Sequence, residues 1–270
     1  MHRILYGTAW KAADTADLVE LAIRSGFRAV DTACQPKHYN EPGVGEGIAR
    51  CLGNDLRRED LYIQTKFTPI PGQDPQRIPY DPNATLAQQV DQSFEVSRKN
   101  LRVDRLDALV LHSPLPTLHQ TLEVWHAMEE LVDRGGVLRL GISNLYAPRV
   151  LEALHREVRI KPSILQNRFY ADTGYDHELR AYCREHDIVY QSFWTLTANP
   201  HLLATPVVRV LAEAHGWTPA QVFFRFLTQI GITPLTGTRS EQHMREDLAI
   251  FDKTLTEAEL EELAPLIRVG

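Results

Sequence analysis

Eight short strand-like runs alternate with amphipathic helical patterns from one end of the chain to the other. The strand-like runs cover residues 3–9, 29–33, 61–67, 106–112, 138–144, 163–168, 189–194 and 233–238. Helical apolar spacing separates them, for example at residues 14–26, 85–102, 118–134, 149–158, 177–187 and 240–251. The run at 106–111 is almost continuously apolar, which is typical of a parallel strand covered on both sides. The alternation predicts a parallel α/β fold made of repeated βα units.

The length of the chain selects among the parallel α/β folds. A (β/α)8 barrel takes about 250 residues, and this chain has 270. No Ser/Gly-rich linker and no sharp change in charge divides the sequence into two parts. We therefore predict one closed (β/α)8 TIM barrel that forms a single domain over residues 1–270.

Composition limits the partners and the compartment. The chain has 29 basic and 35 acidic side chains and a net charge of −6, the wrong sign for a protein that binds a nucleic-acid backbone. No apolar run approaches the roughly eighteen residues of a membrane span. Cys34, Cys51 and Cys183 are an odd number without a C-x-x-C pair, which favours a reducing compartment. We expect a cytoplasmic protein with no nucleic-acid and no membrane partner.

Two segments have more than one interpretation. Residues 69–82 hold five of the 16 prolines, and they form either a stiff surface connection or a pocket wall with Tyr80 pointing inward. Cys183 and His186 are three residues apart on one predicted helix, which is the spacing of half a metal site. Because no second pair accompanies them, we predict that these two residues pack the helix and that the protein binds no metal.

Polar residues end several of the apolar strands, which is where barrel enzymes assemble their active sites. Asp31 ends the second run, Lys66 the third and His112 the fourth. We expect Asp31 and Lys66 to form a buried ion pair at one barrel mouth, because each charge offsets the desolvation of the other. The Lys66 ammonium is expected to lower the pKa of a nearby tyrosine toward neutrality, which makes that tyrosine a general acid. His112 is expected to orient a carbonyl oxygen.

The same residues lie within motifs that resemble those of the aldo-keto reductase family. The resemblance runs from Gly7 to Leu248, and its motifs are 26–33 (GFRAVDTA), 39–41 (YNE), 63–66 (IQTK), 109–114 (LVLHSP), 141–144 (GISN) and 166–167 (QN). It implies a (β/α)8 barrel that binds an extended nicotinamide cofactor without a Rossmann domain. It also implies a catalytic tetrad and a set that hydrogen-bonds the nicotinamide carboxamide: Asp31, Tyr39, Lys66 and His112, and Ser143, Asn144 and Gln166.

The substrate side of the site departs from the family pattern. Residues 34–38 make the loop before Tyr39 longer than in most members, so this tyrosine is assigned from the Asn40-Glu41 that follows it. We expect the substrate pocket to include Trp10, Tyr80 and His112.

The cofactor side departs from the pattern as well. Phe193 stands where many members stack a tyrosine on the nicotinamide ring, and Leu235 stands where many members place a lysine. Arg239 becomes the expected phosphate-binding residue, because guanidinium groups and helix N-termini both suit phosphate. The resemblance extends the expected cofactor-binding set to Thr236, Gly237, Thr238, His243 and Asp247.

We therefore predict an NAD(P)H-dependent oxidoreductase that reduces an aldehyde or ketone to the alcohol, with Tyr39 as general acid. NADPH is the expected cofactor and NADH is possible, since Leu235 replaces the usual lysine. The expected partner is a small carbonyl compound, and the expected state is a monomer or weak homo-oligomer. Two alternatives stay open, which are a cofactor-binding but catalytically idle regulatory subunit and a metal-dependent hydrolase barrel that uses Asp31 and His112. Retention of the whole tetrad disfavours the first, and the small number of ligands at strand ends disfavours the second.

Overall fold

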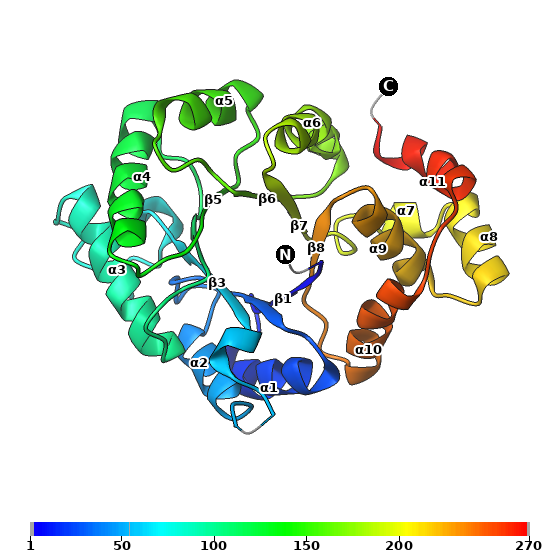
Figure 1. The fold of residues 1–270 in the computed structure, drawn as a ribbon, viewed down its shortest axis with the longest axis horizontal. Helices are drawn as coiled ribbons and strands as arrows, with labels where there is room; N and C mark the ends of the chain where they lie inside the picture. The colour runs from blue at the N-terminus through cyan, green and yellow to red at the C-terminus, as the bar shows by residue number, and fades with distance from the viewer. Residues whose placement is uncertain (1–2, 54, 269–270) are drawn as a thin grey trace.

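A closed ring of parallel strands forms the centre of the computed structural model, which describes residues 3–53 and 55–268 (Figure 1). Within that part of the chain the ring has eight strands in sequence order, and β1 pairs with β8 to close it. The strands are β1 (Leu5–Gly7), β2 (Ala29–Asp31), β3 (Tyr62–Phe67), β4 (Ala108–Leu111), β5 (Leu140–Ser143), β6 (Ile164–Arg168), β7 (Val189–Phe193) and β8 (Thr233–Thr236). Each strand falls inside one of the predicted runs, so the predicted (β/α)8 barrel is confirmed.

Helices cover the outside of the ring (Figure 1). They are α1 (Thr15–Ser25), α2 (Glu41–Ala49), α3 (Leu86–Leu101), α4 (Leu118–Asp133), α5 (Pro148–Glu157), α6 (His177–Glu185), α7 (Pro200–Leu203), α8 (Pro206–His215), α9 (Pro219–Gln229), α10 (Glu241–Ala249) and α11 (Glu257–Leu263). The sequence patterns did not delimit α7, α8 and α9, which lie between β7 and β8. Each of these three begins with a proline, a residue that fits the first helical position because its missing N–H has no partner there.

The apolar core has two parts of very different size. The larger part lies between the strands and the helices and includes Trp125 of α4 and Phe223 of α9. The smaller part lies inside the ring, where Leu5, Ala29 and Leu235 pack together. Most of the buried apolar side chains therefore pack the helices against the ring. The interior of the ring at the carboxyl ends of the strands is left for polar side chains.

Strand β3 shows how the barrel divides polar from apolar residues. Successive side chains of a strand point to opposite faces. Ile63 and Phe67 belong to the outer core, whereas Gln64 and Lys66 make hydrogen bonds inside the ring. The alternation places Lys66 at the carboxyl end of the interior, where the ends of neighbouring strands also converge.

The loop that carries Tyr39 is fixed on both sides. Asn40 is the N-cap of α2, and its side-chain oxygen accepts a hydrogen bond from the first turn of that helix at 3.1 Å. Its amide nitrogen donates to the Ala12 carbonyl at 3.0 Å and so holds the loop after β1. A Cβ on Gly45 would lie 2.0 Å from the Asn100 carbonyl oxygen, so only glycine allows α2 to approach the end of α3 this closely.

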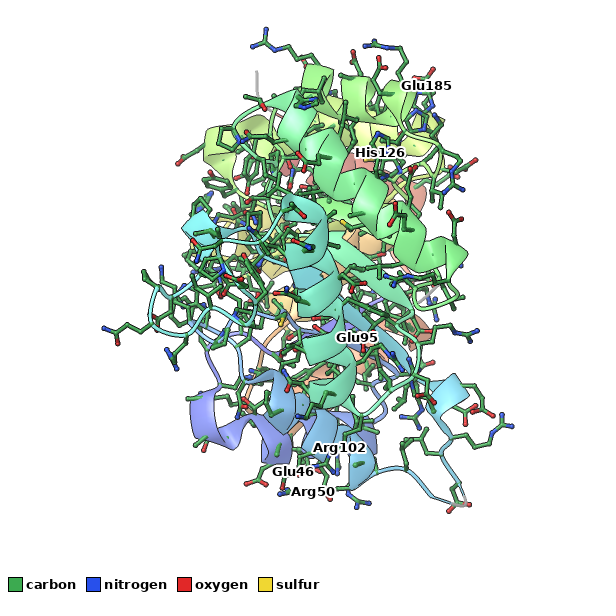
Figure 2. All side chains as sticks on the ribbon, turned by 90° about the vertical axis from the view of Figure 1, so that its left-hand side faces the viewer. Glu46, Arg50, Glu95, Arg102, His126 and Glu185 are labelled. Carbon is green, nitrogen blue, oxygen red and sulfur yellow. The ribbon has the colours of Figure 1, made fainter. Side chains whose placement is uncertain are left out.

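The outer faces of the helices carry many charged side chains. Figure 2 shows Glu46 of α2, Arg50 at the C-cap of that helix, Glu95 of α3 and Glu185 of α6 on the outside of the molecule. Arg50 pairs with Asp17 of α1 at 2.6 Å, and such exposed pairs contribute about 0–1 kcal/mol each. The described part of the chain contains no helix that is both long and apolar enough to cross a membrane.

Candidate active site

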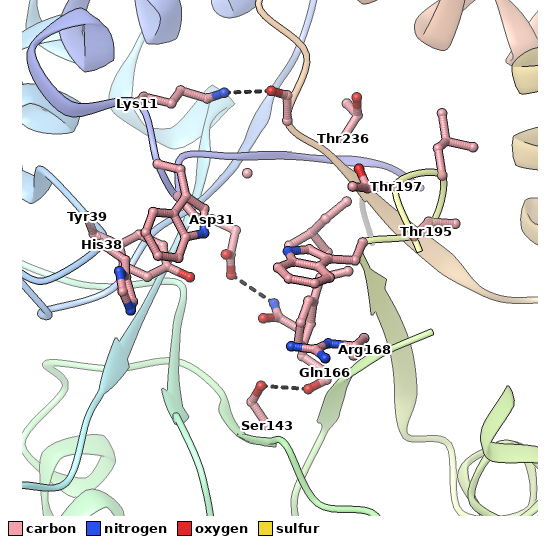
Figure 3. A pocket seen from close by; sticks show the side chains of 18 of the residues that line it. Lys11, Asp31, His38, Tyr39, Ser143, Gln166, Arg168, Thr195, Thr197 and Thr236 are labelled. Atoms are coloured by element: carbon pink, nitrogen blue, oxygen red, sulfur yellow. Dashed lines mark hydrogen bonds between the residues drawn. The ribbon is translucent and has the colours of Figure 1, made fainter. Parts of the chain in front are cut away.

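A cleft of about 720 Å³ opens at the carboxyl ends of the strands (Figure 3). Its walls come from the segments that follow β1, β2 and β4 and from the ends of β5, β6, β7 and β8. The predicted site residues that line it are Trp10, Asp31, Tyr39, His112, Ser143, Asn144, Gln166, Phe193, Thr236, Gly237, Thr238 and Arg239. Residues that lie far apart in the sequence therefore meet in one cleft.

Asp31 and Lys66 form an ion pair at the bottom of the cleft. Lys66 Nζ donates to Asp31 Oδ2 at 2.6 Å and to the Thr32 carbonyl at 2.9 Å. The two side chains are 3% and 1% exposed, so the expected buried pair is present. Burial lowers the pKa of Lys66, but the Asp31 carboxylate and the Tyr39 phenol outweigh burial and hold that pKa above its ordinary value. Lys66 is a cation at neutral pH.

Tyr39 lies beside this pair. Lys66 Nζ is 5.3 Å from the centre of the Tyr39 ring, and the ring meets His112 edge-on at a centroid distance of 6.0 Å. Burial raises the pKa of Tyr39, and this effect outweighs the lowering by the Lys66 ammonium. The net shift is upward, which corrects the expectation that Lys66 moves this pKa toward neutrality. The hydroxyl keeps its proton at neutral pH, which is the form that a general acid needs.

His112 follows β4 and is neutral. Its Nδ1 lies 2.6 Å from the Thr68 hydroxyl oxygen, and its carbonyl accepts a hydrogen bond from Asn144 Nδ2 at 2.8 Å. Burial, together with the nearby charge of Lys66, holds the pKa of His112 well below its usual value. Because Thr68 engages Nδ1, Nε2 is the ring nitrogen left for a ligand in the cleft.

The predicted carboxamide-binding residues are themselves hydrogen-bonded. Gln166 Nε2 donates to Asp31 Oδ1 and to Gln191 Oε1, each at 2.9 Å. Ser143 Oγ donates to the Gln166 carbonyl at 2.6 Å. Gln64 and Gln191 complete a layer of amides next to Asp31, and the sequence analysis missed both. Both could have been found from the sequence, because each is a glutamine at an inward-facing position of a buried strand.

Lys11 is a cleft-lining lysine that the sequence analysis also missed. It follows β1, and its Nζ donates to the Gly237 carbonyl, which follows the neighbouring strand β8, at 2.6 Å (Figure 3). The residue is 2% exposed, and burial followed by the charge of Arg239 lowers the pKa of Lys11 to about 8. No carboxylate in the described residues pairs with Lys11. A cleft-lining cation with this environment suits a phosphate group.

Arg239 is held at the mouth of the cleft by contacts with the loop after β1. Its Nη1 donates to Asp14 Oδ2 at 2.6 Å, and its Nη2 donates to the Trp10 carbonyl at 3.0 Å. Both side chains of this ion pair are more than half exposed. The predicted phosphate-binding arginine therefore already has an anionic partner in the loop after β1.

The comparisons with known proteins agree with this fold. The model of the aldo/keto reductase family matches residues 4–268. This chain belongs to the aldo/keto reductase family. It is 30% identical to a glyoxal reductase of Bacillus subtilis, over 94% of this chain and 83% of that protein. It is 29% identical to an NADH-dependent D-xylose reductase of Candida parapsilosis, over 95% and 86% of the two chains. The crystal structure of an aldo/keto reductase from Brucella melitensis matches with a TM-score of 0.82 and 26% identity, over 98% and 95% of the two chains.

Membership of the aldo/keto reductase family confirms the predicted class of enzyme, an oxidoreductase that reduces carbonyl compounds with NADH or NADPH. Neither alternative is favoured by these relatives. In residues 3–53 and 55–268, no group of three or more His, Cys, Asp or Glu side chains is arranged to hold a metal ion. The hydrolase alternative requires such a group.

Tyr80 lies outside the aldo/keto reductase cleft, which corrects its placement on the pocket wall. Its hydroxyl donates to the Thr68 carbonyl at 2.7 Å, and its ring packs 5.6 Å from the ring of Phe67. Tyr80 is therefore buried against the segment that follows β3. Within residues 69–82 this tyrosine is held by contacts with the segment after β3 and does not line the cleft.

Asp247 and His243 also lie beside the cleft and not in its wall. Asp247 Oδ2 accepts a hydrogen bond from the Thr236 hydroxyl at 2.7 Å, and burial raises the pKa of Asp247 to about 6. His243 is exposed in the first turn of α10. Asp247 therefore holds the cleft-lining Thr236 in place, whereas His243 is open to solvent.

Aromatic side chains frame the open part of the cleft. Trp10 is 59% exposed, and its ring packs against His38 at a centroid distance of 3.8 Å. Trp194 is 44% exposed and follows Phe193 at the end of β7. Trp10, Asn144 and Trp194 have φ values of 63°, 52° and 55°, a region that costs a non-glycine residue about 1–3 kcal/mol. All three residues line the cleft, so the strained backbone positions in this part of the barrel lie at the candidate site.

Proposed function

We propose that this aldo/keto reductase reduces small aldehydes or ketones with NADPH in preference to NADH, and that Tyr39 is its general acid. The observation that carries the proposal is the arrangement at the bottom of the cleft. There a protonated Tyr39 phenol lies between a Lys66 cation and a neutral His112 imidazole. This is the set of groups that protonation of a carbonyl oxygen requires.

Each residue of this set has a separate role in the proposed reaction. Tyr39 donates its hydroxyl proton to the carbonyl oxygen, and Lys66 stabilises the phenolate that forms. Asp31 keeps Lys66 charged in its buried position. We assign the tautomer in which the Thr68 hydroxyl, 2.6 Å from His112 Nδ1, donates to that nitrogen, so that the Nε2–H of the neutral ring orients the carbonyl oxygen.

The cleft also suits an extended dinucleotide. Gln166 and Asn144 provide amides at one side of the cleft, and Phe193 provides a ring for stacking. Lys11, at the other side, is a buried cation without a carboxylate partner in the described residues. When bound, NADH or NADPH supplies the hydride that the carbonyl carbon accepts.

The preference for NADPH rests on Arg239. The additional phosphate of NADPH carries nearly two negative charges, which favours a neighbouring guanidinium. Leu235 supplies no charge, and Arg239 must exchange Asp14 for the phosphate. We therefore propose a weaker preference for NADPH than a lysine in place of Leu235 would give.

We also propose that residues 1–270 act as one domain in a cytoplasmic monomer or weak homo-oligomer. Strand pairing continues around the ring from β1 to β8 and leaves no boundary between parts. Exposed apolar side chains such as Leu52, Leu118 and Val210 come from different elements. Size-exclusion chromatography with light scattering tests the monomer, and a stable dimer at micromolar concentration would contradict it.

The test of the proposed function is the oxidation of NADPH and NADH with a panel of small carbonyl compounds, followed by the loss of cofactor absorbance. We include glyoxal and D-xylose because the two relatives are named for them. We expect turnover that is insensitive to EDTA and faster with NADPH at limiting cofactor. Tight cofactor binding without turnover of any carbonyl would support the idle subunit, and loss of activity in EDTA would support the metal enzyme.

A further inference from the structure

Arg168 is a cleft-lining cation to which neither the tetrad nor the proposed cofactor site gives a role. It ends β6 two residues beyond Gln166, so the two side chains project from the same face of the strand. Figure 3 shows its guanidinium in the cleft close to Gln166. The guanidinium carbon lies 4.2 Å from the centre of the Trp194 ring and 5.3 Å from the centre of the Tyr170 ring. The two aromatic rings hold the cation in place.

Among residues 3–53 and 55–268, the Arg168 guanidinium has no anionic partner. In the described part of the chain, no carboxylate pairs with Arg168 and no acceptor takes a hydrogen bond from its side chain. Asp176, the buried acid in the segment after β6, is committed elsewhere because its Oδ2 accepts from Asn167 at 2.6 Å and from Tyr190 at 2.8 Å. Stacking on an aromatic face leaves the in-plane N–H groups of an arginine ready to bind a ligand.

The distribution of charge separates Arg168 from the cofactor phosphates. Asp31 is the carboxylate among the described residues of the cleft wall, and it pairs with Lys66. Lys11 and Arg239 lie in the loops after β1 and β8, where the phosphates are proposed to bind. Figure 3 places Lys11 and Arg168 on opposite sides of the cleft, with Asp31 between them. The cofactor therefore accounts for the cations near β1 and β8 and leaves Arg168 for another anion.

Resting on the proposed function, we propose that the substrate is a carbonyl compound that carries a carboxylate or phosphate, and that Arg168 binds this anionic group. The carbonyl oxygen of the same molecule lies at Tyr39 and His112. A guanidinium binds either oxyanion through two parallel N–H groups. Because Trp194 and Tyr170 already hold the side chain, little of its rotational freedom is lost on binding.

The experiment compares matched pairs of substrates that differ in one anionic group. The carboxylate arm uses 4-oxobutanoate and its methyl ester, and the phosphate arm uses glyceraldehyde 3-phosphate and glyceraldehyde. We measure the ratio of kcat/KM for the charged and neutral member in the wild type, Arg168→Gln and Arg168→Lys. Arg209→Gln is the control, since Arg209 is exposed on α8 outside the barrel.

We expect the wild type to favour the charged member of one pair by about 10- to 100-fold, which is the size of one charge-assisted contact. Arg168→Gln should abolish this ratio, mainly through KM, Arg168→Lys should retain part of it, and Arg209→Gln should retain all of it. The pair that shows the ratio identifies carboxylate or phosphate as the anionic group.

Five results would overturn the inference. A wild-type ratio near one in both pairs, or an unchanged ratio in Arg168→Gln, would contradict the proposed anion site. The proposed function would still stand in either case if any member of the pairs is reduced. Equal loss of activity on charged and neutral members in Arg168→Gln would show a structural role. A matching loss of NADPH affinity in direct titration would assign Arg168 to the cofactor. If no carbonyl compound of the panel is reduced, the proposed function fails and the inference fails with it.

Discussion

Lys66 Nζ lies 2.6 Å from Asp31 Oδ2, and neither side chain is more than 3% exposed. Each charge alone would be very costly at this depth, because burial removes the water that solvates an ion. Together they form a neutral unit that still presents an ammonium group to Tyr39. The pair therefore serves the chemistry of the site, and an apolar pair of similar volume would stabilise the fold at least as well.

Asp31→Asn should destabilise the protein strongly, because it leaves Lys66 buried without its counter-ion. Loss of one partner of a buried pair costs about 3–5 kcal/mol, and urea unfolding at neutral pH measures this loss. Asp31→Asn combined with Lys66→Met should recover much of the stability without activity. Arg159→Gln is the matched control, because it breaks an exposed pair with Asp133 and should cost less than about 1 kcal/mol. Equal losses in Asp31→Asn and Arg159→Gln would contradict the argument.

Tyr39→Phe should lower kcat by about 10²- to 10⁴-fold, since it removes the proton donor and keeps the ring. The affinity for NADPH should change little, and fluorescence titration of the cofactor checks this. Tyr80→Phe is the control tyrosine, because its hydroxyl contacts a backbone carbonyl outside the cleft. Near-normal turnover in Tyr39→Phe would assign the proton to another group.

Substitutions of Asp14 and Arg239 should change the preference for NADPH over NADH in opposite directions. Arg239→Ala removes the proposed phosphate contact, so NADPH affinity should fall by about 10- to 100-fold with little change for NADH. Asp14→Asn releases Arg239 from its ion pair and should strengthen NADPH binding. Titration of both cofactors against both variants measures the effect. If Arg239→Ala lowered the affinity for both cofactors equally, Arg239 would not be the residue that binds the additional phosphate of NADPH.

Lys11 should make cofactor binding depend on pH. Burial lowers the pKa of Lys11 to about 8, so the side chain is mostly a cation at pH 7 and mostly neutral at pH 9. Phosphate favours the cation, and the affinity for NADH and NADPH should therefore fall by up to about tenfold as pH rises through this range. Lys11→Met should bind more weakly at pH 7 and lose most of this slope. A slope that persists unchanged in Lys11→Met would place the titrating group elsewhere.

Much of the fold and of the catalytic set can be predicted from the sequence because the signals are local. A buried parallel strand is a short apolar run, and the βα alternation brings all carboxyl ends to one face of the barrel. Asp31, Lys66 and His112 can be found as polar residues at these ends, and the Asn40-Glu41 that follows Tyr39 identifies the tyrosine. Sequence alone thus determined the barrel, its family resemblance and the residues proposed for proton transfer.

Tertiary structure decided the features that depend on distance across the cleft and on depth of burial. Asp14 and Arg239 are 225 positions apart, and their ion pair exists because the loops after β1 and β8 meet where the ring closes. Arg168 has no carboxylate partner among the described residues, because Asp176, the buried acid after β6, accepts hydrogen bonds from Asn167 and Tyr190. The upward shift in the pKa of Tyr39 is the balance between desolvation and the Lys66 charge. Neither the approach of two distant loops nor the depth of a hydroxyl group is encoded in a local pattern of residues, because both arise only when all eight strands close into the barrel.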